Sequence, residues 1–140
     1  AGLDAATLAH ARLVRDADKL DIFRVFEAAA ADGMLERNPE MTWGLQMDGP
    51  PAPDVLQAAA VGSTIDYAQV RSLADFILIQ AGWLAGGLHY RTALRLAAER
   101  RVLEFREEFL GRLCGRDAVQ ECCEAVRLRM SRRLAETEAA

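Results

Sequence analysis

The chain is poor in the residues that build small disulfide-bonded or zinc-binding domains. Its 140 residues include three cysteines, two of them adjacent, and no C-x-x-C pair. An odd number of thiols without such a pair encodes neither a disulfide framework nor a zinc site. We therefore expect Cys114, Cys122 and Cys123 to be reduced thiols in the core of a cytosolic, cytoplasmic protein.

Long apolar runs and a surplus of positive charge are also lacking. No uninterrupted apolar stretch approaches the ~20 residues of a membrane span, and no signal peptide is visible at the start. Lys and Arg number 17 against 21 Asp and Glu, which gives a net charge of -4. Binding to duplex nucleic acid needs a surplus of Lys and Arg to neutralise phosphates. We expect neither a membrane nor duplex nucleic acid as a partner.

Strand patterns are absent, whereas apolar residues recur at helical spacing. Hydrophobic residues make up 51% of the chain, enough for one core. We predict a single all-α domain over residues 1–140, a helical bundle of about five to seven helices. Turn signals such as Asp48-Gly49 and Pro50-Pro51 predict that residues 33–53 form an irregular, lid-like connection packed onto the bundle. The helices are predicted over residues 3–31, 54–61, 67–84, 90–103, 104–113 and 117–135.

The first predicted helix carries acids within an apolar pattern. Residues three and four apart share a helix face, and that spacing aligns His10, Val14, Asp18, Asp21 and Val25. We expect this face to be buried. A buried carboxylate is costly unless it is paired, hydrogen-bonded or bound to metal, so this face becomes the candidate functional site. The neighbouring acid, Asp16, is instead expected to face solvent and form a salt bridge.

The segment that contains these acids, residues 12–21 (Arg-Leu-Val-Arg-Asp-Ala-Asp-Lys-Leu-Asp), resembles the C-terminal signature of the HD-domain metal-dependent phosphohydrolases. In that superfamily a helical bundle binds one or two divalent metals through a His, a His-Asp doublet and a later Asp in an Ala-Asp-x-Leu context. Residues 17–20 match that context. Residues 75–83 are similar to a stretch that follows the motif in one bacterial branch, so the resemblance covers roughly residues 8–109.

The resemblance implies an all-α fold, a divalent metal cofactor (Mg, Mn or Fe) and a phosphate-containing small molecule as substrate, a nucleotide being the expected example. By the same match Asp18 is the last metal ligand, and Asp21 orients the groups around it. We expect Lys19 and Arg15 to contact the phosphate, with a solvated charged face as the simpler alternative. Asp75 is a further substrate candidate, with helix capping or pairing to Arg71 as the simpler alternative.

One departure from the family pattern is large. No His-Asp pair occurs, and the two histidines are His10, on the same helix as Asp18, and His89, far downstream. We therefore expect the chain to be the C-terminal portion of a longer HD-type enzyme, inactive by itself, or a shortened protein that has lost catalysis. The alternative is a non-catalytic helical binding or oligomerisation module in which a partner helix or a second copy, as a homo-oligomer, covers the exposed apolar face. A basic side, formed by Arg91, Arg95, Arg100, Arg101 and Arg106, is expected to be solvated, with a phosphate-bearing ligand as the alternative.

Overall fold

The computed structural model describes residues 4–38 and 44–136, and most of these residues are helical. The described residues contain no strand, only an isolated bridge between Gln46 and Ser72, so the all-α prediction is confirmed. None of the described helices is long and apolar enough to cross a membrane. The elements are α1 (Ala5–Ala31), α2 (Met34–Arg37), α3 (Pro53–Val61), the 3-10 turn η2 (Tyr67–Gln69), α4 (Leu73–Gly82), the π-helical turn η3 (Trp83–Gly87), α5 (Arg91–Glu99), α6 (Val102–Cys114), the 3-10 turn η4 (Arg116–Ala118) and α7 (Gln120–Ala135).

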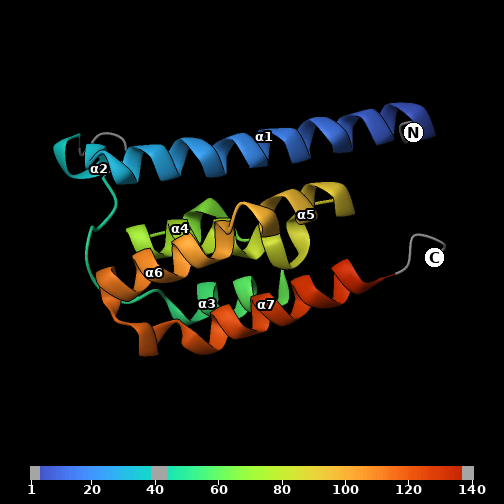
Figure 1. Cartoon of the computed structure of the whole chain (residues 1–140). Helices are drawn as coiled ribbons and strands as arrows, with labels where there is room; N and C mark the ends of the chain where they lie inside the picture. The colour runs from blue at the N-terminus through green and yellow to red at the C-terminus, as the bar shows by residue number, and fades with distance from the viewer. Residues whose placement is uncertain (1–3, 39–43, 137–140) are drawn as a thin grey trace.

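The helices are arranged in three tiers. Helix α1 runs along one side of the molecule, α4, α5 and α6 form the middle, and α3 with α7 forms the opposite side (Figure 1). The 27 residues of α1 make it about 40 Å long at 1.5 Å per residue, the length of the whole bundle. Helix α1 begins and α7 ends at the same end of the molecule (Figure 1).

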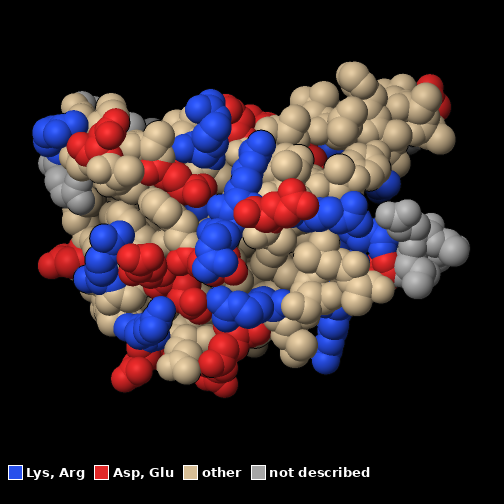
Figure 2. All heavy atoms as spheres, in the orientation of Figure 1, with Lys and Arg blue, Asp and Glu red and all other residues tan. Residues whose placement is uncertain are grey.

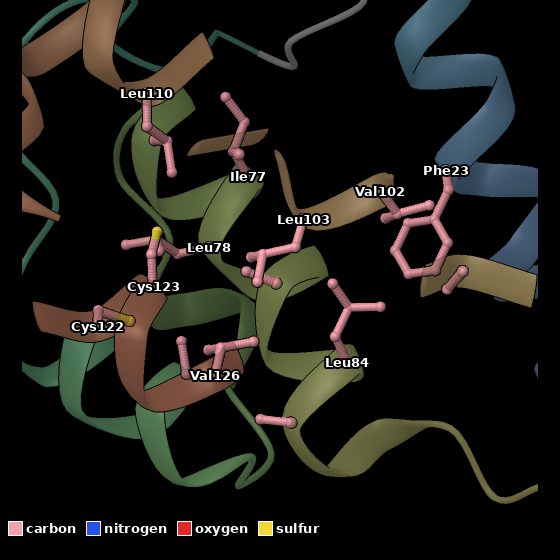
Figure 3. Packing of buried hydrophobic residues seen from close by; sticks show 14 of the residues in the cluster. Phe23, Ile77, Leu78, Leu84, Val102, Leu103, Leu110, Cys122, Cys123 and Val126 are labelled. Carbon is pink, nitrogen blue, oxygen red and sulfur yellow. The ribbon is translucent and has the colours of Figure 1, made fainter. Parts of the chain in front are cut away.

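The core lies around α4, whose residues are buried on nearly every side. Leu78 of α4, Leu103 of α6 and Val126 of α7 meet at its centre, and Phe23 brings α1 to its edge (Figure 3). One face of the last helix points into the core, because Val119, Val126 and Met130 are all buried. The three thiols are free, as predicted, but Cys114 is only half-buried whereas Cys122 and Cys123 lie in the core.

Several helix ends follow local sequence signals. Asp4 caps α1, since its Oδ1 accepts a hydrogen bond from the backbone N of Thr7 at 2.7 Å. Gly33, which follows the C-cap of α1, and Gly62, the C-cap of α3, have φ angles of 69° and 71°. Glycine adopts such angles without strain, so both glycines end helices.

The predicted helix over residues 67–84 is wrong in its first part. The chain is extended at residues 70–72 and α4 starts only at Leu73. Ser72 caps α4: its Oγ accepts from the backbone N of Asp75 at 3.1 Å, and the Asp75 carboxylate accepts from the backbone N of Ser72 at 3.2 Å. The N–H of Leu73 donates to the carbonyl oxygen of Gln46 at 2.8 Å, which ties the extended segment to the 44–47 segment.

Two further boundaries differ from the prediction. The helix expected over residues 90–103 ends at Glu99, and Arg101 has a left-handed φ of 58° before α6 begins at Val102. The connection over residues 33–53 contains the short helix α2, and Met34 and Met47 pack against the core as expected. Trp43, which belongs to the same connection, lies outside the described residues.

Candidate functional site

The face of α1 that carries Asp18 and Asp21 is exposed to solvent, whereas it was predicted to be buried. Asp18 and Asp21 are both exposed, and Val14 and Val25 on the same face are 54% and 49% exposed. The helix packs instead through Asp16, Phe23, Phe26 and Ala29. Both faces have apolar residues at helical spacing, and the face with the two phenylalanines buries more apolar area.

The buried acid of this motif is Asp16, which had been expected in solvent. It is 2% exposed, and its two carboxylate oxygens accept hydrogen bonds from the backbone N atoms of His89 and Tyr90, each at 2.8 Å. These two residues immediately precede the first turn of α5. The carboxylate therefore lies at the positive end of a helix dipole, which compensates its burial without a cation.

A cleft of about 750 Å³ opens between α1 and the turns that follow α3 and α4. Three of the predicted site residues, Arg15, Asp18 and Lys19, line it from α1. Ser63 and Thr64 line it after α3, and Trp83 lines it from η3. Tyr67 of η2 lines it as well, so the cleft combines two cations, one carboxylate and three hydroxyls with two aromatic rings, a mixture suited to a small anionic ligand.

Lys19 is the most constrained cation in the cleft. Its Nζ donates to the carbonyl oxygen of Gly87 at 2.7 Å and lies 5.6 Å from the centre of the Trp83 ring. Partial burial lowers the pKa of Lys19, and the negative charge of Asp16 acts in the opposite direction. The side chain is thus positioned over η3 rather than free in solvent.

Close backbone contact between two turns shapes the cleft. A Cβ atom on Gly62 would lie 2.7 Å from the backbone N of Gly86, and one on Gly86 would lie 2.7 Å from the carbonyl oxygen of Gly62. Such distances are far inside van der Waals contact, so only glycine fits at either position. Both glycines line the cleft.

The other two predicted site residues lie elsewhere. Asp21 Oδ1 pairs with Arg24 Nη2 at 2.9 Å on the surface of α1. Asp75 is buried, and its oxygens accept from the backbone N atoms of Ala52 at 2.8 Å and Arg71 at 3.0 Å, in addition to Ser72. Neither Asp21 nor Asp75 lines the cleft, and the geometry of Asp75 matches the simpler capping interpretation.

The cleft does not contain a full set of metal ligands within the described part of the chain. No group of three or more His, Cys, Asp or Glu side chains suited to a metal occurs among these residues. Asp18 is the only described carboxylate that lines the cleft, and His10 and His89 are not among the residues lining it. One carboxylate is fewer than a metal site normally supplies, so no metal-dependent step follows from these residues alone.

Sequence reasoning missed the most deeply buried charge, Arg106 of α6, which had been assigned to the solvated basic side. It is fully buried. Its Nε and Nη2 donate to Gln80 Oε1 at 2.9 and 2.8 Å, and its Nη1 donates to Glu27 Oε2 at 3.1 Å. Its guanidinium also lies 4.9 Å from the Phe23 ring centre. The signal was present: residues 102, 103, 106 and 110 form one helical face, and the other three are apolar.

Comparisons with known proteins identified no relative of this chain. No family model matches the chain, and no curated protein or solved structure matches it either.

Proposed function

We propose that this chain supplies the phosphate-binding wall of an HD-type, metal-dependent phosphohydrolase site that acts on a phosphate ester, with a nucleotide as the expected substrate. One observation supports the proposal: Arg15, Asp18 and Lys19, all from the motif that resembles the HD signature, line the same cleft. These three residues share one helix face, so the packing of α1 brings either all of them or none to the cleft, whereas Asp16 and Asp21 of the same motif lie outside it.

Each cleft residue would have a distinct role. The Arg15 guanidinium and the Lys19 ammonium supply charge-assisted hydrogen bonds to phosphate oxygens. The hydroxyls of Ser63 and Thr64 lie on the opposite wall, and the Trp83 ring offers a flat surface for a base. Asp18 contributes one hard oxygen of the kind that Mg²⁺, Mn²⁺ or iron prefers.

The remaining metal ligands would come from a segment outside the described residues. When bound, a divalent metal in such a site polarises phosphoryl oxygens and lowers the pKa of a bound water. We therefore propose that residues 1–140 are the C-terminal portion of the enzyme and bind the phosphate ester without hydrolysing it. A coding sequence that extends upstream of Ala1 and encodes a His and a His-Asp doublet would support this proposal.

Titration calorimetry with AMP in the absence of metal tests the binding role. We expect Lys19→Met and Arg15→Gln each to weaken AMP binding about tenfold, because each removes a charge-assisted hydrogen bond worth about 1.5 kcal/mol. Arg24→Gln is the matched control, since Arg24 is an exposed arginine on the same helix that does not line the cleft. Equal affinities for all four proteins would rule out the phosphate-binding cleft.

A turnover assay tests whether this chain alone hydrolyses a phosphate ester. With p-nitrophenyl phosphate and added Mn²⁺ we expect no activity from this chain, because Asp18 alone does not form a metal site. Metal-dependent turnover that Asp18→Asn abolishes would show that the chain holds a complete site, contrary to the proposal.

The alternative function, a non-catalytic helical binding or oligomerisation module, is favoured by a different observation. The side chains of Leu8, Leu13, Val14 and Val25 on α1 are 36–58% exposed, and Figure 2 shows few charges where the beginning of α1 projects from the bundle. A second copy that packs on α1 would cover this surface. Sedimentation should then show a dimer that Leu13→Glu dissociates, and a strict monomer at high concentration would count against this function.

A further inference from the structure

An apolar hollow lies beside the cleft, between α1 and α4. One cavity of about 360 Å³ adjoins a second of about 480 Å³, and the two share Ile22, Leu45, Phe76 and Gln80. Their other described lining residues are apolar except for Asp21, the Tyr67 hydroxyl and the indole N–H of Trp83. A hollow of this size and lining suits a small apolar molecule.

Gln80, which lines both cavities, has one side-chain polar atom without a partner. Gln80 is fully buried, and among the described residues its Nε2 is the one buried side-chain nitrogen or oxygen without a hydrogen bond. Buried amide groups are almost always paired because desolvation without a hydrogen bond costs stability. An unpaired donor beside a hollow therefore points to an acceptor that arrives with a ligand.

The orientation of the Gln80 amide is fixed by Arg106. Two guanidinium nitrogens donate to Gln80 Oε1, so reversing the amide would direct its NH₂ group against a cation. Arg106 is itself held by Glu27 Oε2 at 3.1 Å and by the carbonyl oxygens of Val102 and Phe23 at 3.0 and 3.2 Å. The NH₂ end of Gln80 must therefore face away from the guanidinium.

We propose that this hollow binds a small apolar molecule with one carbonyl oxygen, which accepts a hydrogen bond from Gln80 Nε2. A neutral carbonyl fits better than a carboxylate, because Gln80 Nε2 is the one buried donor without a partner among the described lining residues and Asp21 lies at the same cavity. This site uses neither Arg15 nor Lys19 of the phosphate-binding cleft, although the hollow and the cleft share Ile22, Tyr67, Ile79 and Trp83 along their common border.

The test compares benzophenone with diphenylmethane, two probes of nearly equal shape that differ in the carbonyl. We expect the whole chain to bind benzophenone about five- to tenfold more tightly, the effect of about 1 kcal/mol from one hydrogen bond. Irradiation of bound benzophenone should cross-link it to residues of the hollow, with Ile22, Val25 and Leu45 as the expected sites.

Two variants identify the donor and the location. Gln80→Glu keeps an oxygen for Arg106 but replaces the free donor with an acceptor, so it should remove the preference for benzophenone while diphenylmethane still binds. Val25→Trp, at a half-exposed lining position, should weaken both probes, and circular dichroism would verify that each variant is folded. Equal affinities for the two probes, no binding of either, or a preference that persists in Gln80→Glu would each overturn the proposal.

Discussion

Asp16 shows how a single carboxylate holds α1 against the bundle. The acids of residues 16–21 have similar sequence surroundings, but only Asp16 is buried. Its two bonds to the backbone N–H groups of His89 and Tyr90 join segments 73 and 74 residues apart. The compensation that a buried acid requires is thus supplied by the start of α5 rather than by a cation.

Replacement of Asp16 should therefore be costly, whereas replacement of Asp18 should not. Asp16→Ala leaves two backbone N–H groups without their acceptor, and we expect a loss of about 3 kcal/mol in the free energy of unfolding. Asp18→Ala changes an exposed side chain, and the expected change lies within about 0.5 kcal/mol. Urea denaturation of both variants measures the difference; similar losses would contradict the assigned role of Asp16.

The two core thiols make stability depend on pH in the alkaline range. Burial raises the pKa of Cys122 from an ordinary value of 9.0 to about 11 and that of Cys123 to about 12. The folded protein therefore holds these protons at pH values where the unfolded chain has lost them. Because the folded state then binds more protons, stability falls as the pH rises above 9 and continues to fall towards 11–12.

We expect the midpoint of urea unfolding to decrease between about pH 8 and about pH 10. Other groups also titrate there, so the control is the double variant Cys122→Ala/Cys123→Ala, which should show a shallower decrease. The same pH dependence in both proteins would mean that the thiols do not cause it.

At the level of secondary structure, the contact between the end of α3 and η3 gives the cleft its shape. Gly62 and the Gly86-Gly87 pair were recognisable in the sequence as breaks in helices. The direct contact between these two turns could not be recognised in the sequence, because no residue in either segment indicates that the two backbones touch.

This contact predicts different costs for two glycines with nearly equal φ angles. Gly62→Ala forces a Cβ against the backbone of Gly86 and also strains a φ of +71°. Gly44 has a φ of +73° but no atom within 4 Å of the added Cβ. We expect Gly44→Ala to cost about 1 kcal/mol and Gly62→Ala about 3 kcal/mol or more. Thermal unfolding of both variants compares the two losses in stability, and equal losses would show that the contact with Gly86 adds nothing to the cost of the strained φ angle.

For the molecule as a whole, the pattern of apolar residues predicted the fold class and most of the core. The buried positions of α7 follow helical spacing, and helix ends near Gly33, Gly62 and Gly115 follow from glycine conformation. Each of these features depends on residues that are close together in the chain, so it can be predicted from the sequence alone. The break before Leu73 was missed because the apolar pattern continues through Ser72, whose capping role depends on the adjacent Asp75.

The candidate site was only partly predictable for the same reason. Arg15, Asp18 and Lys19 do meet in one cleft, because residues within one helical turn must lie close together. The sequence of α1 does not indicate which of its faces packs against the bundle, because both faces carry apolar residues. The packed face depends on a contact with a distant segment, in which the ring centres of Phe23 and Trp83 lie 5.7 Å apart. The burial of Arg106 likewise depends on Gln80 and Glu27, which lie 26 and 79 residues away.

The anchoring of α1 at Asp16 divides this helix into two parts with different behaviour in hydrogen exchange. Before Asp16 the described residues are exposed except for the half-buried Ala11, whereas Phe23 and Phe26 belong to the core. Backbone amides of the first three turns should therefore exchange through local fraying. Those around the two phenylalanines should exchange only when the entire bundle opens.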